Sequence, residues 1–132
     1  MTERVATCRC GGLKAICSGA PQRNSVCHCF TCKQRTGSAF AWNATFAREQ
    51  VAIDGESRVF ETLSDEGRWS RMHFCPTCGT TVYYEIELRP DMVSVPAGGF
   101  ATLDLPEPGV EGFGERRNAW VRIAPKEAPA QE

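Results

Sequence analysis

Residues 75–79 read Cys75-Pro76-Thr77-Cys78-Gly79, and this short stretch decides how the chain must fold. Two cysteines three positions apart can bind one metal ion, the proline stiffens the turn between them, and the glycine permits the positive φ angle that directs backbone amides toward the sulfurs. Such a turn is a zinc knuckle. Because a knuckle supplies only two of the four ligands of a tetrahedral structural site, two further ligands must come from elsewhere in the chain.

The other cysteines of the chain are the candidates for these missing ligands. The 132 residues contain eight cysteines, and all but Cys17 fall into close groups: Cys8 and Cys10, then Cys27, Cys29 and Cys32, then Cys75 and Cys78. Close grouping favours metal binding over disulfides or scattered free thiols, because neighbouring thiolates can converge on one ion. Cys8 and Cys10 form the only other two-ligand group. We therefore expect a closed, structural zinc site of four cysteines that ties the N-terminus to a distant strand.

The middle group, Cys27-His28-Cys29-Phe30-Thr31-Cys32, predicts a second and different zinc site. Three protein ligands with one open position are typical of a catalytic zinc. Three thiolates on Zn²⁺ leave a net charge of about −1, which makes the ion a weak Lewis acid and a poor generator of hydroxide. A soft, electron-rich site suits a fourth sulfur ligand instead, held as a nucleophilic thiolate. We therefore hypothesise carbon–sulfur chemistry at this site.

Several residues near the second group have more than one interpretation. Cys17 could complete the site, although a lone cysteine on a predicted strand is more often a small buried residue. His28 lies between two ligands and is expected to point outward or to contact the ligands indirectly rather than to bind the ion. Lys33 and Arg35 could be a solvated polar turn, or they could hold the carboxylates of a ligand.

The rest of the sequence predicts a mainly β fold. Extended segments are expected at residues 12–17, 38–46, 50–53, 58–62, 69–74, 80–87 and 92–95. A short helical turn should follow Cys32 and end at Gly37, and Asp54-Gly55-Glu56 should join two strands as a hairpin. We expect one domain over residues 1–123, since no second core fits in this length, and a mobile Pro/Ala/Glu-rich tail over residues 124–132.

Charge and hydropathy exclude several classes of partner. The net charge is −1 and the pI is about 6.1, with acidic and basic residues interleaved, so neither nucleic acid nor an anionic membrane is an expected partner. The charged N-terminal residues lack the apolar stretch of a signal peptide, and no apolar run has the roughly 18 residues of a membrane span. We expect a cytoplasmic protein, and no pattern predicts its oligomeric state.

Three motifs together resemble a known family. They are Cys8-x-Cys10-Gly11, then Cys27-His28-Cys29-x-x-Cys32 followed by Arg35-Thr36-Gly37-Ser38, and finally Phe74-Cys75-Pro76-x-Cys78-Gly79-Thr80. In order and spacing they are similar to the motifs of glutathione-dependent formaldehyde-activating enzymes and centromere protein V, over about residues 5–123. The resemblance implies small, zinc-ribbon-like sheets in a β-tent around two zinc ions, with Cys27, Cys29 and Cys32 at the catalytic site. It also implies condensation of formaldehyde with glutathione, which in reverse is a carbon–sulfur lyase reaction.

Two functional hypotheses follow from these observations. In the first, the zinc ion at the three-cysteine site binds a small thiol such as glutathione, which adds to formaldehyde or a related small aldehyde or leaves from the adduct. Candidate contacts for the thiol are Lys33, Arg35, Thr36 and Ser38. In the second, the chain is a non-catalytic zinc carrier or interaction module, whose second ion is completed by water, by Cys17 or by a partner.

Overall fold

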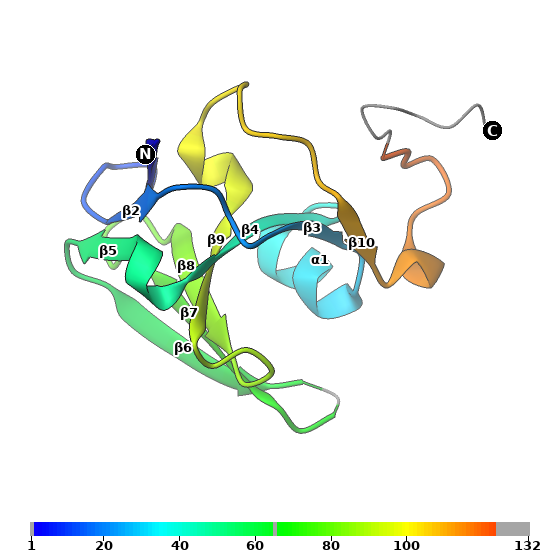
Figure 1. The fold of residues 1–132 in the computed structure, drawn as a ribbon. Coiled ribbons are helices and arrows are strands. Elements are labelled where there is room, and N and C mark those ends of the chain that lie inside the picture. The colour runs from blue at the N-terminus through cyan, green and yellow to red at the C-terminus, as the bar shows by residue number, and fades with distance from the viewer. Residues whose placement is uncertain (1, 65, 124–132) are drawn as a thin grey trace.

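The computed structural model describes residues 2–64 and 66–123, and within them the chain is mainly β with one α-helix (Figure 1). The strands are β1 (Glu3–Thr7), β2 (Lys14–Ser18), β3 (Arg23–Cys27), β4 (Ala41–Ala47), β5 (Val51–Asp54), β6 (Arg58–Leu63), β7 (Trp69–Phe74), β8 (Thr81–Ile86), β9 (Met92–Pro96) and β10 (Val110–Gly112). The helix α1 spans Phe30–Thr36, and short 3₁₀ turns occur at η1 (Arg48–Gln50), η2 (Ala97–Phe100) and η3 (Gly114–Arg116). No helix in this described part combines the length and apolar character needed to cross a membrane.

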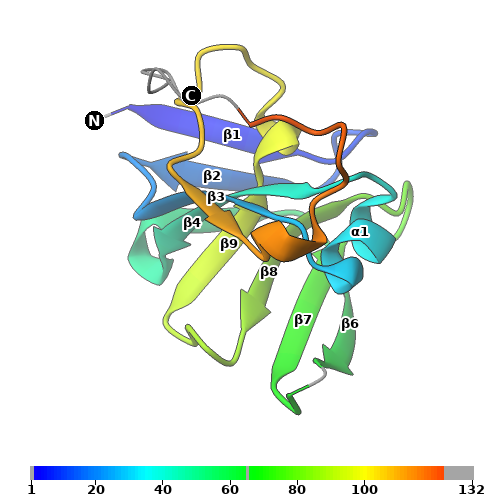
Figure 2. The ribbon, with the colours of Figure 1, turned by 90° about the vertical axis from the view of Figure 1, so that its right-hand side faces the viewer.

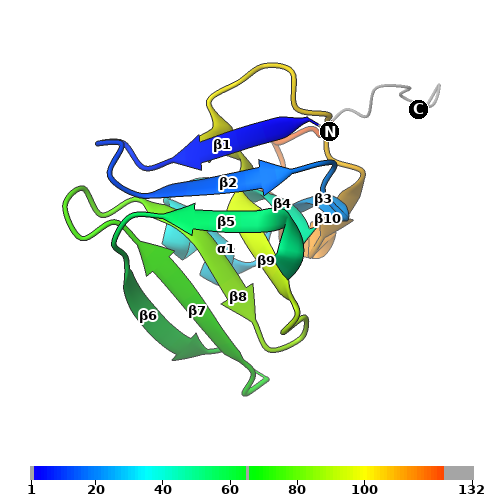
Figure 3. The ribbon, with the colours of Figure 1, turned by 60° about the vertical axis from the view of Figure 1, so that its left-hand side comes forward.

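The strands form two sheets that pack against each other. The smaller sheet has the order β1-β2-β5, and the larger has the order β10-β3-β4-β9-β8-β7-β6. Neighbouring strands are antiparallel, except that β10 runs parallel to β3. Figure 3 shows β1, β2 and β5 as a layer that crosses over the strands of the larger sheet. The core therefore lies between the two sheets.

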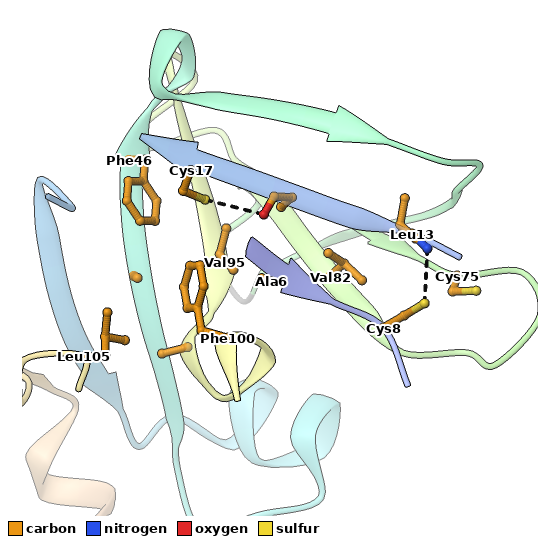
Figure 4. Close-up of a cluster of buried hydrophobic side chains, with 13 residues drawn as sticks. Ala6, Cys8, Leu13, Cys17, Phe46, Cys75, Val82, Val95, Phe100 and Leu105 are labelled. Carbon is orange, nitrogen blue, oxygen red and sulfur yellow. Dashed lines mark hydrogen bonds between the residues drawn. The ribbon is translucent and has the colours of Figure 1, made fainter. Parts of the chain in front are cut away.

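Alternation of side chains along the central strands builds this core. Phe46 of β4 and Val95 of β9 are fully buried, and Cys17 of β2 meets them from the smaller sheet (Figure 4). The ring of Phe100, in η2, packs edge-to-face on Phe46 with 6.3 Å between ring centroids, a favourable aromatic geometry. Burial of these apolar surfaces is the main force that holds the sheets together.

Most expected strands are present, but one predicted connection is wrong. Strands β5 and β6 do form on either side of Asp54-Gly55-Glu56, yet they do not pair as a hairpin: β5 pairs with β2, and β6 pairs with β7. The segment instead carries the chain from one sheet to the other. The sequence also gave no prediction of β1, β3 or β10, which have only three to five residues each. The predicted helical turn is present and ends at Gly37, although α1 begins before Cys32. The predicted tail, residues 124–132, lies outside the described residues.

The crossing at Gly55 depends on the absence of a side chain. Gly55 has φ of +108°, and a Cβ placed there would lie 2.0 Å from the carbonyl oxygen of Gly12. That carbonyl belongs to backbone near the start of β2, so it cannot move aside as a flexible side chain could. Only glycine allows the chain to leave the smaller sheet at this point.

Gly55→Ala should therefore destabilise the protein more than an alanine at another glycine with positive φ. Gly67 is the matched control, because its φ is +81° and a Cβ there would meet nothing within 4 Å. We expect a loss of about 1 kcal/mol for Gly67→Ala from backbone strain alone. For Gly55→Ala we expect about 2 kcal/mol more from the clash. Urea denaturation followed by circular dichroism measures both values, and equal losses would contradict this explanation of the crossing.

Candidate metal centres

The first cysteine cluster joins the two sheets. Cys8 and Cys10 lie in the connection between β1 and β2 of the smaller sheet, and Cys75 and Cys78 lie between β7 and β8 of the larger sheet. The four sulfur atoms all lie within 4.8 Å of one another. Two measured separations are 3.7 Å, for Cys8 to Cys10, and 3.6 Å, for Cys10 to Cys75. A tetrahedral ion with Zn–S bonds of about 2.3 Å places its sulfurs about 3.8 Å apart, so zinc fits this cluster.

Backbone amides and a hydroxyl point at these sulfurs, as they do in zinc knuckles. The amide of Leu13 donates to Cys8 Sγ at 3.2 Å (Figure 4), and the amide of Thr77 donates to Cys75 Sγ at 3.4 Å. Hydrogen bonds from the side chain and backbone of Thr80 lower the pKa of the Cys78 thiol to about 5. Donors of this kind stabilise thiolates, which are the form that binds a metal ion.

The second cluster is built at the end of β3 and the start of α1. Cys27 is the last residue of β3, Cys29 caps the N-terminus of α1, and Cys32 lies in the first turn of the helix. The Cys29 sulfur accepts a hydrogen bond from the backbone amide of Cys32 at 3.3 Å. The three sulfurs also lie within 4.8 Å of one another, and all three residues are half-buried. This cluster could therefore hold an ion near the surface.

Cys17 does not join the second cluster. Its side chain is wholly buried in the core, and its sulfur lies near the carbonyl oxygen of Ala15 in its own strand. Burial raises the pKa of the Cys17 thiol to about 11, so this thiol stays protonated and unreactive at neutral pH. Its interpretation as a small buried core residue is confirmed.

The thiols of the second cluster share their protons unequally. A hydrogen bond from Cys32 is the main reason that the pKa of Cys27 is lowered, while the same bond and burial raise the pKa of Cys32. Cys27 therefore has a lower pKa than Cys32 and ionises more readily, and a cation would favour the loss of the Cys32 proton.

The predicted thiol contacts all lie on α1 or directly after it. Thr36 Oγ1 donates to the Cys32 carbonyl and accepts from the Ser38 amide, so its hydroxyl closes the end of the helix. The ammonium of Lys33 donates to the Arg116 carbonyl at 2.7 Å and to Asn118 Oδ1 at 2.8 Å. Two of its three hydrogens are thus already used within the chain.

Arg35 differs from these residues because part of its hydrogen-bonding capacity is unused. Its guanidinium lies over the ring of Tyr84, 4.9 Å from the centroid, and its Nη2 atom is buried without a hydrogen-bond partner among the described residues. Tyr84 was not predicted from the sequence, where it appears as an ordinary strand residue. It is buried on β8, which raises its pKa, and the nearby charges of Cys32 and Cys27 add to this effect.

His28 points inward rather than outward, which corrects that part of the expectation. Its side chain is completely buried, and its Nε2 atom lies 2.7 Å from a carboxylate oxygen of Glu111. Because an ionised carboxylate only accepts hydrogen bonds, Nε2 carries the hydrogen. No sequence pattern could have found this pair, since the two residues are 83 positions apart.

Fold and clusters together define the class: a mainly β protein with two cysteine clusters that could each hold a metal ion. The sequence model of the family described as "Glutathione-dependent formaldehyde-activating enzyme" matches residues 3–116, and the chain belongs to this family. The family implies activation of formaldehyde by glutathione, and the matched residues include both clusters.

A solved structure shares the fold. It is the crystal structure of a protein from Rhodobacter sphaeroides, 19% identical to this chain, with a TM-score of 0.62 over 81% of this chain and 98% of the other. At this level of identity the likeness concerns the fold alone. No curated protein matches the chain significantly.

The positions of the two clusters predict that cysteine substitutions destabilise the protein by very different amounts. Cys75→Ser should lower the free energy of unfolding by about 4 kcal/mol or more, because a metal ion bound between the two sheets couples its binding energy to folding. Cys29→Ser should cost much less, since serine can take over the helix cap and this cluster joins no second sheet. Denaturation curves and metal content by mass spectrometry measure both effects. A Cys75→Ser protein with two ions and full stability would contradict the assignment of the first cluster.

Proposed function

We propose that the protein is a zinc-dependent enzyme of the carbon–sulfur lyase type, with two zinc ions per chain. It combines a small thiol such as glutathione with formaldehyde or a related small aldehyde, or runs this reaction in reverse. The observation that carries the proposal is the difference between the clusters: four sulfurs meet between the sheets, whereas three half-buried sulfurs meet at α1. A zinc ion held by three sulfurs would bind a substrate thiol as its thiolate.

The chemistry requires few further groups. A zinc ion held here would supply stabilisation of the substrate in its thiolate form, with the thiol proton released to solvent. The thiol sulfur would then form a bond to the aldehyde carbon while the carbonyl π electrons move to oxygen, which would take a proton from solvent. The product is a hydroxymethyl thioether, and no oxidant or reductant takes part. Cys27, Cys29 and Cys32 are the residues that we propose to hold the reacting centre, and their half-buried position leaves a small aldehyde free to approach.

Arg35 is the best-supported contact for the rest of the thiol. The guanidinium of Arg35 lies 4.9 Å from the centroid of the Tyr84 ring, a cation–π contact that helps to hold it in place, and a guanidinium can bind a carboxylate with two parallel hydrogen bonds. Its unpartnered, buried Nη2 atom is a donor that a substrate carboxylate would satisfy. Lys33, Thr36 and Ser38 are proposed as weaker contacts, since the side chains of Lys33 and Thr36 already have partners in the chain.

Reduced thiols also bear on the location of the protein. Cysteines in close groups are typical of metal binding in a reducing compartment, whereas an oxidising compartment favours disulfides. We therefore propose a cytoplasmic location.

A non-catalytic zinc carrier or interaction module is the second candidate. Phe30, between two cysteines of the second cluster, is 59% exposed, and Trp120 is 74% exposed. Exposed aromatic side chains are typical of protein interfaces.

The proposed activity is tested by the rate of hydroxymethyl-thiol formation from glutathione and formaldehyde, corrected for the uncatalysed reaction. Wild-type protein should accelerate the reaction, and Cys29→Ser protein should not, because it lacks one of the three sulfurs. Carbon-13 nuclear magnetic resonance with labelled formaldehyde follows the product directly. Corrected rates near zero for both proteins would reject the enzyme and leave the carrier or interaction module.

Arg35→Ala should weaken binding of glutathione about tenfold or more, the loss expected for one charge-assisted pair, without changing the zinc content. Cysteamine, a thiol without carboxylates, should bind equally well to both proteins. Arg68→Ala is the control, since Arg68 is half-exposed and paired with Glu66 far from the cluster. Isothermal titration calorimetry gives the dissociation constants, and an unchanged value for glutathione would remove Arg35 from the site.

A further inference from the structure

The segment of residues 110–118 lies along the three-cysteine loop, although more than 80 positions separate them in sequence (Figure 2). Its first part, β10, is the only parallel partner in the sheets of the described residues and pairs with β3 up to Gly112 and Cys27. Its second part, which contains η3, lies beside α1. Both the strand and the 3₁₀ turn of this segment therefore border the candidate site.

Contacts at both ends of the cysteine loop attach it to this segment. At the beginning of the loop, the amide of His28 donates to the Gly112 carbonyl at 3.1 Å, and its ring bonds to Glu111 at 2.7 Å. At the end of the loop, Lys33 donates to the backbone of Arg116 and the side chain of Asn118. The loop is thus held on both sides of its three sulfurs.

The segment itself is bent to reach both ends. Phe113, between these two groups of contacts, has a φ of +55°, a left-handed conformation that costs a non-glycine residue of the order of 1 kcal/mol or more. Such a conformation persists only where the surroundings determine it. The guanidinium of Arg116 lies 5.1 Å from the ring centroid of Phe30 and 5.2 Å from that of Phe113, which adds a further link between the loop and the segment.

The physical need for such a support follows from the number of ligands. In the first cluster, an ion shared by the two pairs of sulfurs would fix each pair relative to the other. The second cluster has no second group of sulfurs, so its six-residue loop must be kept in shape by other contacts if its fourth position is to stay free. Groups that bond to the residues around metal ligands commonly perform this task.

We infer that residues 110–118 form a support segment in which Glu111 and the acceptors of Lys33 position the three-cysteine loop for metal binding. His28 and Lys33 are then positioning residues, and this inference rests on the proposed function of the second cluster. It assigns two of the three ammonium hydrogens of Lys33 to the support segment, which is why Lys33 is only a weak contact for the carboxylates of a substrate.

Lys33→Met and Glu111→Ala test the support segment. Methionine keeps the apolar stem of Lys33 but removes the ammonium, and Arg4→Met is the control because it removes an ion pair, with Asp104, at another place. Transfer of zinc to a chromophoric chelator is followed in the zinc-loaded proteins. In Lys33→Met and Glu111→Ala, the faster-released ion should leave about tenfold faster than in wild type, and the other ion should leave at the wild-type rate. Glu111→Gln keeps an acceptor, so its release rate for the faster ion should lie between those of wild type and Glu111→Ala.

Cobalt(II) substitution adds a readout that a general loss of stability would not produce. The ligand-field bands of the three-sulfur site should shift in Lys33→Met and stay unchanged in Arg4→Met. Release rates within twofold of wild type together with unchanged bands would overturn the inference. The Lys33 variant keeps the test valid if Glu111→Ala does not fold.

The outcome also separates this inference from the proposed function. If wild-type protein holds only one ion, the proposed function fails. The support segment can then still be tested by itself, by measuring the rate of amide hydrogen exchange in residues 27–33. Exchange about tenfold faster in Lys33→Met than in wild type, with no change in Arg4→Met, supports it. Unchanged exchange in that case overturns it.

Discussion

The convergence of four sulfur atoms between the two sheets is the constraint on which the architecture depends. No pair of hydrogen-bonded strands joins the three-stranded sheet to the seven-stranded sheet in the described residues. Their contact consists of the apolar core and, at one end, of the Cys8–Cys10 and Cys75–Cys78 turns. Four thiolates within 4.8 Å of one another would repel one another strongly without a cation. A metal ion at this place would convert that repulsion into a link between the sheets.

The two clusters offer the same kind of ligand in different surroundings. In the first cluster, Cys8 and Cys75 are buried and receive backbone hydrogen bonds, whereas Cys78 is half-buried and Cys10 is exposed. The second cluster lies half-buried beside a short helix, next to a guanidinium that has an unused donor. Electron-rich sulfur ligands favour thiolate chemistry over activation of water. This combination agrees with a family that is described by its use of glutathione and formaldehyde.

Two cations close to the second cluster, Lys33 and Arg35, have different surroundings. Lys33 follows the last cysteine directly, a position from which it could have reached a substrate, but its ammonium bonds to the Arg116 carbonyl and Asn118. Arg35, two residues later, lies over the Tyr84 ring, and its buried Nη2 atom has no hydrogen-bond partner among the described residues. Two neighbouring cations on one helical turn therefore differ: the ammonium of Lys33 is bound within the chain, whereas the guanidinium of Arg35 keeps an unused donor.

The sequence by itself determined the cysteine groups, the short helix that ends at Gly37 and most of the strands, because each depends on residues close together in the chain. The signals for these features are local: the spacing of cysteines, a glycine where φ must be positive, and the alternation of apolar and polar residues along a strand. Only the tertiary structure decided that the strands beside Gly55 belong to different sheets, and that His28 is buried against Glu111. Both features depend on contacts between residues about 40 to 80 positions apart. Such contacts cost chain entropy, and only the formation of the whole core offsets this loss.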